Sequence, residues 1–253
     1  MTIDPDTEGK NAVITGGSKG IGLAAALELL RRGSNVAVVA RTFSEEVRTE
    51  LEHTGCGKCY FLTADLSRPK ERVKLIERAA DCLGGPIDIL FNNAGGVTDG
   101  SITDISEEEY VRSRELLFDS AVDLMRQVLP LMYARNSGVI VNTASIFGLR
   151  SAEGCFTYSV FKHALISATE NAARSAARHG VRINCIAPGT TRTGLTEGRG
   201  DFTGERYKKT VAQYPIGRLG TTEDIVNAFL FLISDASSFI CGHTLVSDGG
   251  FLA

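Results

Sequence analysis

Short apolar runs rich in β-branched residues alternate with amphipathic helical segments along nearly the whole chain. The runs that fit buried strands are residues 11–15, 35–40, 59–63, 87–92, 138–143, 182–187 and 244–247. The segments with helical periodicity are residues 21–32, 44–53, 68–82, 107–135, 157–179 and 223–234. Strands that alternate with helices pair in parallel and carry helices on both faces. The pattern therefore predicts an α/β fold, a doubly wound parallel sheet of about seven strands.

The composition sets limits on size and partners. The chain has 253 residues, of which 43% are hydrophobic, so it can bury a sizeable core. No linker, repeat or low-complexity stretch divides it, and we expect a single domain over residues 1–253. The net charge of −3 argues against a nucleic-acid partner. No run approaches the roughly 18 apolar residues of a membrane span, and we expect no membrane partner.

Six cysteines are scattered along the chain, and its first ten residues lack the apolar stretch of a signal peptide. We therefore expect reduced thiols in a cytoplasmic protein. Cys56 and Cys59 form a CxxC pair, which fits either a redox pair or half of a zinc site. Because no second pair of ligands accompanies it, we expect this segment to be a turn before a strand, and we expect no metal site.

A glycine-rich loop follows the first predicted strand and precedes the first predicted helix. Glycines at this position permit a tight turn and a close approach of the backbone to a pyrophosphate. The helix that follows offers free N–H groups and the positive end of its dipole. This arrangement predicts a dinucleotide site, and the residues expected to contact the cofactor are Gly16, Ser18, Lys19, Gly20, Ile21 and Gly22.

The end of the second predicted strand indicates which dinucleotide binds. An NAD enzyme usually places an acid there to accept a hydrogen bond from the ribose 2′-hydroxyl. Here the strand ends without a carboxylate and is followed by Arg41 and Thr42. A guanidinium can hold a 2′-phosphate by charge-assisted hydrogen bonds, and Lys19 can add a second charge. We therefore predict NADP(H), the alternative being that Arg41 is an ordinary solvated surface residue.

Tyr158 and Lys162 are spaced four residues apart in a predicted helix, and Ser145 lies upstream at the end of a predicted strand. Side chains at this spacing share one helix face. A nearby ammonium favours the phenolate, which would lower the pKa of Tyr158 and let it exchange a proton near neutral pH. The pattern predicts catalysis at a carbonyl or alcohol group. The alternative is an aromatic residue packed on the core beside a solvated lysine.

These motifs together resemble the short-chain dehydrogenase/reductase family, in its single-domain branch, and are similar to 3-oxoacyl-(acyl carrier protein) reductases and ketone reductases. The matching segments include the glycine loop, the NNAG sequence that begins at Asn92, and the Ser145, Tyr158 and Lys162 set. The resemblance implies a Rossmann fold, with these three residues catalytic, and a homo-oligomer, either tetramer or dimer. It also implies cofactor contacts from Asp65, Leu66, Asn93, Ala94, Gly95, Tyr158, Lys162, Pro188, Gly189, Thr191 and Thr193.

One position departs from the family pattern. Members usually carry an asparagine in the long helix before the catalytic serine, where it helps to hold a water linked to the lysine. Here Leu117 stands at that position, and leucine cannot hydrogen-bond a water. Ser113, Asp119 and Ser120 are the nearest small polar residues. The departure leaves two alternatives open, a nucleotide-binding sensor and a non-redox relative that catalyses elimination or epimerisation.

The substrate site is predicted from nearness to these motifs. Ser145, Phe147, Cys155, Tyr158 and Thr190 are expected to contact the substrate, and most of their surroundings are apolar. The predicted function is an NADP(H)-dependent oxidoreductase that acts on a ketone or secondary alcohol, with Tyr158 as general acid or base. A polar segment with four glycines, residues 190–209, is predicted to be a lid over this site, the alternative being a surface loop.

Overall fold

The computed structural model describes residues 6–98, 100–193 and 204–253. Its centre is one sheet of seven parallel strands in the order β3-β2-β1-β4-β5-β6-β7. The strands are β1 (Asn11–Thr15), β2 (Asn35–Ala40), β3 (Cys59–Thr63), β4 (Ile89–Asn92), β5 (Gly138–Thr143), β6 (Val181–Pro188) and β7 (Thr244–Ser247). The strand order changes direction at β1, between β2 and β4, and a crevice forms at such a point. The predicted fold class is confirmed.

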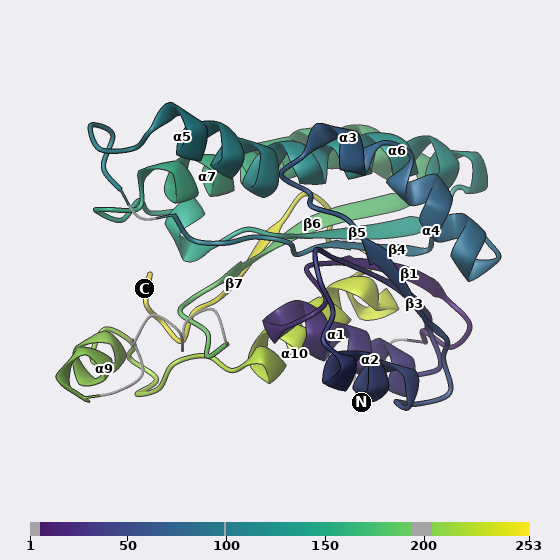
Figure 1. The fold of residues 1–253 in the computed structure, drawn as a ribbon, viewed down its shortest axis with the longest axis horizontal. Coiled ribbons are helices and arrows are strands. Elements are labelled where there is room, and N and C mark those ends of the chain that lie inside the picture. The colour runs from purple at the N-terminus through teal and green to yellow at the C-terminus, as the bar shows by residue number, and fades with distance from the viewer. Residues whose placement is uncertain (1–5, 99, 194–203) are drawn as a thin grey trace.

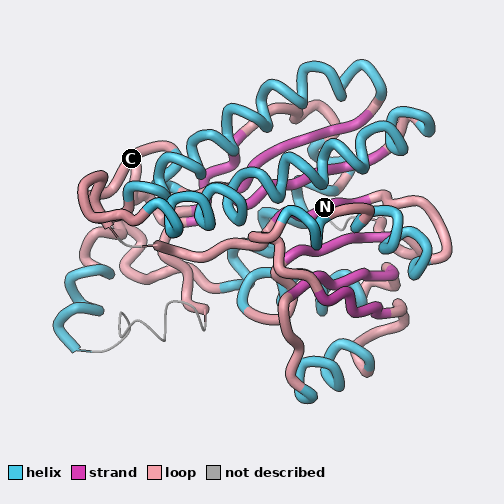
Figure 2. Tube along the Cα trace, turned by 45° about the horizontal axis from the view of Figure 1, so that its top comes forward, coloured by secondary structure: helices cyan, strands magenta, loops and turns pink. Residues whose placement is uncertain are grey.

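Helices cover both faces of the sheet (Figure 1). One face carries α1 (Gly20–Arg31), α2 (Glu45–Glu52) and α10 (Thr222–Ile233). The other carries α3 (Pro69–Arg72), α4 (Leu75–Leu83), α5 (Glu107–Arg114), α6 (Ser120–Arg135) and α7 (Phe156–Ala176). Short 3₁₀ turns lie at Ile146–Gly148, Ala177–His179 and Asp235–Ser237. Figure 2 shows the loops gathering at the end of the sheet nearest the C-terminus.

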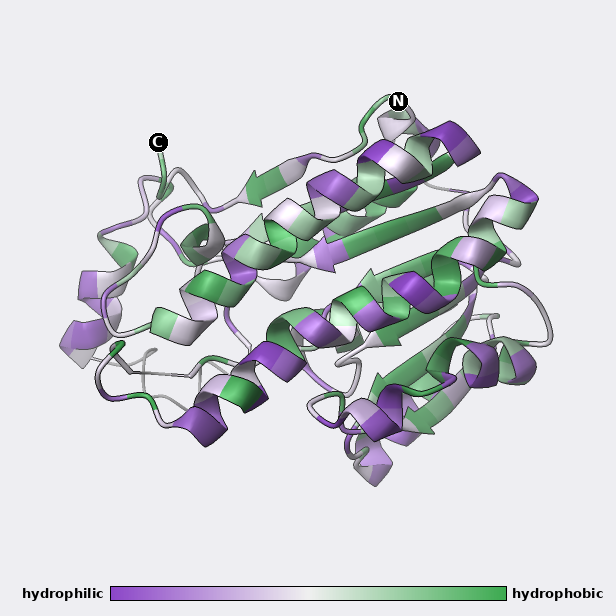
Figure 3. Cartoon of the chain, turned by 90° about the horizontal axis from the view of Figure 1, so that it is seen from above, coloured by the Kyte–Doolittle hydropathy of each residue, from purple (hydrophilic) through white to green (hydrophobic). Residues whose placement is uncertain are grey.

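The core consists of two layers because successive strand residues point to opposite faces. In β1, Ala12 and Ile14 belong to the cluster that packs on α1 and α10, whereas Val13 belongs to the cluster under α4 and α6. Phe91 of β4 stacks on Phe229 of α10 with ring centroids 4.3 Å apart. Strands buried on both faces are apolar nearly throughout, and Figure 3 shows this as hydrophobic strands between helices with polar outer sides.

Three predicted segments differ in the structure. The helix predicted over 68–82 breaks into α3 and α4, because Val73 is extended and Lys74 takes a left-handed conformation with φ 54°. The helix predicted over 107–135 is interrupted by a π-helical turn, Glu115–Asp119. The predicted lid contains a helix, α9 (Gly204–Val211), and its residues 194–203 lie outside the described residues. Among the residues that are described, no helix is both long and apolar enough to cross a membrane.

Candidate functional site

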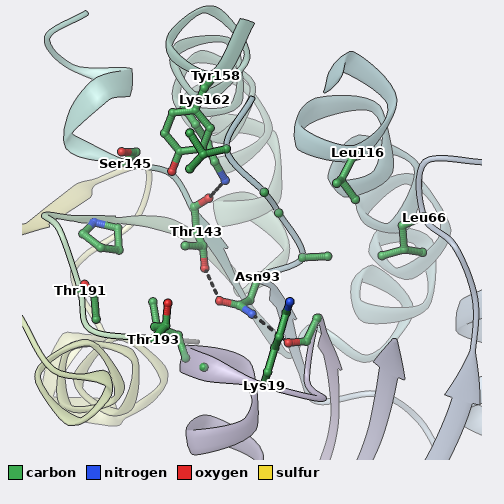
Figure 4. Close-up of a pocket in the computed structure, with 18 of the residues that line it drawn as sticks. Lys19, Leu66, Asn93, Leu116, Thr143, Ser145, Tyr158, Lys162, Thr191 and Thr193 are labelled. Atoms are coloured by element: carbon green, nitrogen blue, oxygen red, sulfur yellow. Dashed lines mark hydrogen bonds between the residues drawn. The ribbon is translucent and has the colours of Figure 1, made fainter. Parts of the chain in front are cut away.

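A cavity of about 460 Å³ lies at the carboxyl ends of the strands and is walled by residues that follow β1 to β6. Every site residue predicted from the sequence lines this cavity except Gly22. Ligands of doubly wound sheets bind at this edge, where the strand order reverses. The structure therefore brings the predicted cofactor residues and the predicted catalytic residues into one continuous space (Figure 4).

The glycine loop is shaped by close backbone contacts. A Cβ on Gly16, which has φ 66°, would lie 2.9 Å from the Ala94 Cα. The same region is tied together by Thr15, whose Oγ1 accepts hydrogen bonds from the Asn93 N–H at 2.9 Å and from the Ala94 N–H at 3.0 Å. Gly22 lies behind the loop, where a Cβ would be 2.4 Å from the Gly16 oxygen. Gly22 therefore allows α1 to approach the loop and lies outside the cavity lining, and its contact with the cofactor stays a prediction.

Charged side chains line the cavity where β2 and β3 end, namely Arg41 after β2 and Asp65 after β3. Arg41 and Thr42 follow β2 and line the cavity beside Lys19. Burial alone raises the pKa of Asp65, but hydrogen bonds from Ser67 and the positive charges of Arg41 and Arg68 lower it overall. Asp65 is therefore an anion near Arg41. Its carboxylate accepts hydrogen bonds from the Ser67 N–H and hydroxyl, which fix the turn after β3.

The three predicted catalytic residues meet at the opposite end. The Ser145 hydroxyl accepts a hydrogen bond from the Phe147 N–H at 3.1 Å, which fixes the turn after β5. Tyr158 and Lys162 come from the first turns of α7, and the Tyr158 hydroxyl points toward the side of Ser145 (Figure 4). Lys162 is 3% exposed, and its ammonium donates to the Thr143 carbonyl at 2.5 Å. This bond anchors Lys162 to the end of β5.

A chain of hydrogen bonds connects this end to the glycine loop (Figure 4). The Thr143 hydroxyl donates to Asn93 Oδ1 at 3.4 Å, and Asn93 Nδ2 donates to the Thr15 carbonyl at 3.1 Å. The side chains of two neighbouring strand ends thus hold Lys162 and the glycine loop in one rigid frame. Such preorganisation is what aligns a bound group with the residues that act on it.

The electrostatics of Tyr158 differ from the prediction. Burial raises the pKa of Tyr158, the Ser145 hydrogen bond lowers it by a smaller amount, and Cys155 adds to the rise. Burial also lowers the pKa of Lys162 from 10.5 to about 8. The Lys162 ammonium lies 5.8 Å from the centre of the Tyr158 ring. The expectation that Lys162 lowers the Tyr158 pKa is wrong in this structure, because burial opposes the charged form of both groups.

The low pKa of Lys162 leads to a stability prediction. A drop from 10.5 to about 8 costs the fold roughly 3 kcal/mol at pH 7, where the lysine is still charged. The bond to Thr143 offsets about 1 kcal/mol of this. We expect Lys162→Met to raise the free energy of unfolding at pH 7 by about 2 kcal/mol. The gain should shrink as the pH rises from about 8 to 10.5, since over this range the folded lysine has lost its proton while the unfolded lysine still binds one, so the stability of the wild type rises with pH.

Thermal or denaturant unfolding at pH 7 and at several higher values measures this effect. Lys208→Met is the matched control, because Lys208 is exposed on α9 and pairs with Glu205 on the surface. It should change stability little at any pH. A Lys162→Met protein that is less stable than the wild type at pH 7, or whose gain does not depend on pH, would contradict the prediction.

Leu117 lies beside Lys162, in the π-helical turn. A Cβ added to Gly95 would be 3.5 Å from Leu117 Cδ2 and 3.7 Å from the Lys162 ammonium, so both side chains flank Gly95. Leu117 is 2% exposed. The polar residues nearby have partners elsewhere. The Ser113 hydroxyl meets Thr98, Asp119 accepts from Arg114, and the Ser120 hydroxyl donates to the Leu116 carbonyl. The structure therefore places an apolar side chain next to the lysine.

The remaining walls belong to the loops after β5 and β6. Phe147 and Cys155 line the cavity on one side, and Pro188, Gly189, Thr190, Thr191 and Thr193 line it on the other. The loop after β6 is held by the Thr190 N–H, which donates to the Tyr214 hydroxyl at 2.8 Å. Phe147 packs against Phe251, with ring centroids 6.5 Å apart. This end of the cavity is mostly apolar.

Some residues of the site were missed by the sequence analysis. Thr143 holds Lys162, and Leu116 and Arg112 line the cavity from the helical segment that contains Leu117. Thr143 could have been found, because it ends a predicted strand two residues before Ser145. Arg112 and Leu116 are four residues apart, but their facing toward the cavity depends on the π-helical turn, which no local pattern predicted.

The CxxC segment shows no sign of activation. Cys56 is exposed, and Cys59 begins β3. Burial, together with the charge of Glu52, raises the pKa of Cys59 to about 12, so the thiol stays protonated and is a poor nucleophile. Within residues 6–98, 100–193 and 204–253, no group of three or more His, Cys, Asp or Glu side chains is placed to hold a metal ion.

Comparison with known proteins decides the family. The model of the enoyl-(acyl carrier protein) reductase family matches residues 16–252. The 3-oxoacyl-(acyl carrier protein) reductase FabG of Chlamydia muridarum is 33% identical over 243 residues, which span 95% of this chain and 96% of that protein. The FabG of Vibrio cholerae is 34% identical over 96% of this chain and 97% of its own. The chain belongs to the short-chain dehydrogenase/reductase family.

A solved structure of this family supports the same assignment. L-sorbose reductase from Gluconobacter frateurii, in complex with NADPH and L-sorbose, superposes with a TM-score of 0.90. It is 31% identical, and the match covers 100% of this chain and 99% of that chain. This short-chain dehydrogenase/reductase is therefore an oxidoreductase of CH–OH or C=O groups whose relatives use nicotinamide cofactors.

Proposed function

We propose that the protein is an NADP(H)-dependent oxidoreductase that interconverts a ketone and a secondary alcohol on a largely apolar substrate. The observation that carries the proposal is the single cavity that joins the glycine loop and Arg41 at one end to Ser145, Tyr158 and Lys162 at the other. NADP(H), when bound, supplies or accepts the hydride.

The residues at the cofactor end fit a dinucleotide with a 2′-phosphate. Gly16 and Gly20 have positive φ values and leave their backbone open toward the cavity, so a pyrophosphate can approach closely. Arg41 and Lys19 are cations on the same wall, and Thr42 adds a hydroxyl. A guanidinium beside a strand end that lacks an acid suits a 2′-phosphate better than a free 2′-hydroxyl. Relatives of the family support this choice, since the sorbose reductase complex contains NADPH.

The residues at the other end provide the acid–base chemistry. The Tyr158 hydroxyl gives its proton to the substrate oxygen in the reductive direction and accepts it in the oxidative direction. The Ser145 hydroxyl donates a hydrogen bond to the same oxygen, where negative charge develops. The Lys162 ammonium, held by the Thr143 carbonyl, supplies positive charge 5.8 Å from the centre of the Tyr158 ring. Because burial raises the Tyr158 pKa, the phenol stays protonated at neutral pH, ready to act as an acid.

The substrate class follows from the cavity walls near Tyr158. Phe147, Cys155, Ile146 and Val97 give this part an apolar lining, and Thr190 adds one hydroxyl. Such a lining favours a ketone on a hydrophobic body or a 3-oxoacyl thioester over a sugar with many hydroxyls, since each buried hydroxyl would need a partner.

The direct test is an assay for oxidation of NADPH by each member of a panel of ketones, diketones, steroids and 3-oxoacyl thioesters. The loss of NADPH absorbance reports the reaction. NADH is run in parallel. Turnover with NADPH on one chemical class supports the proposal and names the class. Tight binding of NADPH without oxidation by any member of the panel would instead favour a nucleotide sensor or a non-redox enzyme.

A nucleotide sensor or a non-redox enzyme is favoured by one observation, the apolar side chain of Leu117 beside Lys162. If leucine there blocks a water that resupplies protons, replacing it should restore the relay. We expect Leu117→Asn to preserve turnover or raise it severalfold, because an amide can hold a water near the ammonium. It should cost about 1–3 kcal/mol of stability, since the position is 2% exposed.

Steady-state turnover and thermal unfolding of Leu117→Asn measure both effects. Leu117→Met is the matched control, because it keeps the site apolar at nearly the same volume. A folded Leu117→Asn protein whose activity collapses, while Leu117→Met stays active, would show that the leucine itself has a role in the site.

A further inference from the structure

The side chain of Arg72 is an almost fully buried cation, with 3% of the residue exposed. Its Nε donates to Asp123 Oδ2 at 2.8 Å, and its Nη2 donates to Glu115 Oε2 at 2.8 Å. Its Nη1 donates to the Leu66 carbonyl at 2.8 Å and to the Glu115 carbonyl at 3.3 Å. A buried guanidinium is tolerated only with such a set of partners, and the planar fork of arginine can serve several of them at once.

These partners come from both sides of one end of the cavity. Leu66 belongs to the segment between β3 and α3, and Glu115 begins the π-helical turn between α5 and α6. Leu66 and Leu116, the residue after Glu115, both line the cavity. Figure 4 shows them on the right of the picture, away from Ser145. Arg72 therefore bonds to the backbone of Leu66, which lines the cavity, and to Glu115, which precedes the lining residue Leu116.

The chain is locally irregular on both sides of this contact. The break between α3 and α4 follows Arg72 directly, and α6 secures it through Gln127, whose Nε2 donates to the Arg72 carbonyl at 3.0 Å. Gln127 Oε1 also accepts from the Ile76 N–H at 3.3 Å. In the π-helical turn, the Ser120 N–H reaches back five residues to the Glu115 carbonyl, which also accepts from Arg72. Gln127 thus holds the break between α3 and α4, and the Arg72 side chain contacts the π-helical turn.

We propose that Arg72 is a positioning residue for the adenosine end of the cofactor site. It holds the Leu66 segment and the π-helical turn at the separation that lets Leu66 and Leu116 form the two walls. The inference rests on the proposed binding of NADP(H) in this cavity. Arg72 does not line the cavity itself, so its effect reaches the ligand only through the residues that it holds.

The test is the dissociation constant of the Arg72→Met protein for NADPH, NADH and 5′-AMP, measured by calorimetry. Displacement of Leu66 and Leu116 should weaken the binding of all three ligands by a similar factor, about tenfold or more, because each contains adenosine. Turnover at saturating cofactor and its pH profile should stay near the wild-type values. Arg72→Lys keeps the charge but loses the planar fork of donors, and its affinities should lie between those of the wild type and of Arg72→Met.

Arg135→Met is the matched control. Arg135 is also a partly buried clamp, since it donates to Asp88 Oδ1 at 3.0 Å and to the Ile87 carbonyl at 2.6 Å. Its partners precede β4, at the end of the sheet opposite the cavity. This variant should lose stability, seen as a lower Tm, and keep its affinity for all three ligands.

The outcomes separate this inference from the proposed function. A wild-type protein that binds none of the ligands would overturn both. With binding by the wild type, an Arg72→Met protein of unchanged affinity overturns the role of Arg72, and so does an equal loss in Arg135→Met. If Arg72→Met does not fold, Asp123→Asn takes its place, since Asp123 is a partner of the same guanidinium with 34% of its side chain exposed. Asp123→Asn should lower the affinity for all three ligands by a similar factor, smaller than the factor expected for Arg72→Met.

Discussion

Tyr158→Phe is expected to lower turnover by about 10²- to 10⁴-fold while leaving NADPH binding close to that of the wild type. The change removes one oxygen at the centre of the proposed chemistry. Phenylalanine can neither give a proton to the substrate oxygen nor donate a hydrogen bond to the charge that develops there. The glycine loop, Arg41 and the bond between Lys162 and Thr143 are untouched, so the cofactor end should keep its affinity.

The comparison needs kcat for the preferred substrate together with the dissociation constant for NADPH. Tyr133→Phe is the control, because Tyr133 stacks on His179 with ring centroids 4.2 Å apart and does not line the cavity. It should keep full activity. Substantial turnover by the Tyr158→Phe protein would show that another group moves the proton, and a matching loss of NADPH affinity would show that the change disturbs the fold of the site.

The two directions of the reaction are expected to differ in their pH dependence. Burial raises the Tyr158 pKa, so the protonated phenol persists through neutral pH and reduction should vary little there. Oxidation needs the phenolate as a base, and its rate should therefore rise with pH. Rates measured in both directions on one substrate and its product check this.

Arg41→Ala is expected to weaken NADPH binding by about 10- to 100-fold and to leave NADH binding nearly unchanged. A hydrogen bond to a charged group contributes about 1.5–3 kcal/mol, which corresponds to this range. Arg41 lines the cavity where β2 ends without an acid, and its positive charge already acts on Asp65. NADH lacks the 2′-phosphate, so removing the guanidinium costs it little.

Fluorescence titration with NADPH and NADH measures the selectivity. Arg68→Ala is the control, because Arg68 also pairs with Asp65 but is exposed and does not line the cavity. It should bind both cofactors as the wild type does. Equal losses for NADPH and NADH in Arg41→Ala would contradict the assignment of the 2′-phosphate contact. A loss confined to NADPH would also distinguish Arg41 from Arg72, for which equal losses are expected.

The sequence by itself determined the features that depend on local spacing. Strands β1 to β3, β5 and β7 occur at the predicted residues, because buried β-branched runs bounded by turns are read directly from the chain. The position of the glycine loop after β1 and the shared helix face of Tyr158 and Lys162 follow from the same local rules. The glycine loop, the NNAG sequence and the Ser145, Tyr158 and Lys162 set, in that order, were also sufficient to indicate the family.

Only the tertiary structure decided the features that depend on distant neighbours. The π-helical turn that contains Leu117 is held by Arg72, which is 43 residues away from Glu115 in the sequence. The break after Arg72 is held by Gln127 of α6, and Thr143 proved to be the partner of Lys162. The Tyr158 pKa moved opposite to the prediction, because its value depends on burial as well as on the lysine four residues away. Periodicity depends on residues that are close in the sequence, whereas burial and long-range hydrogen bonds exist only once the chain has folded.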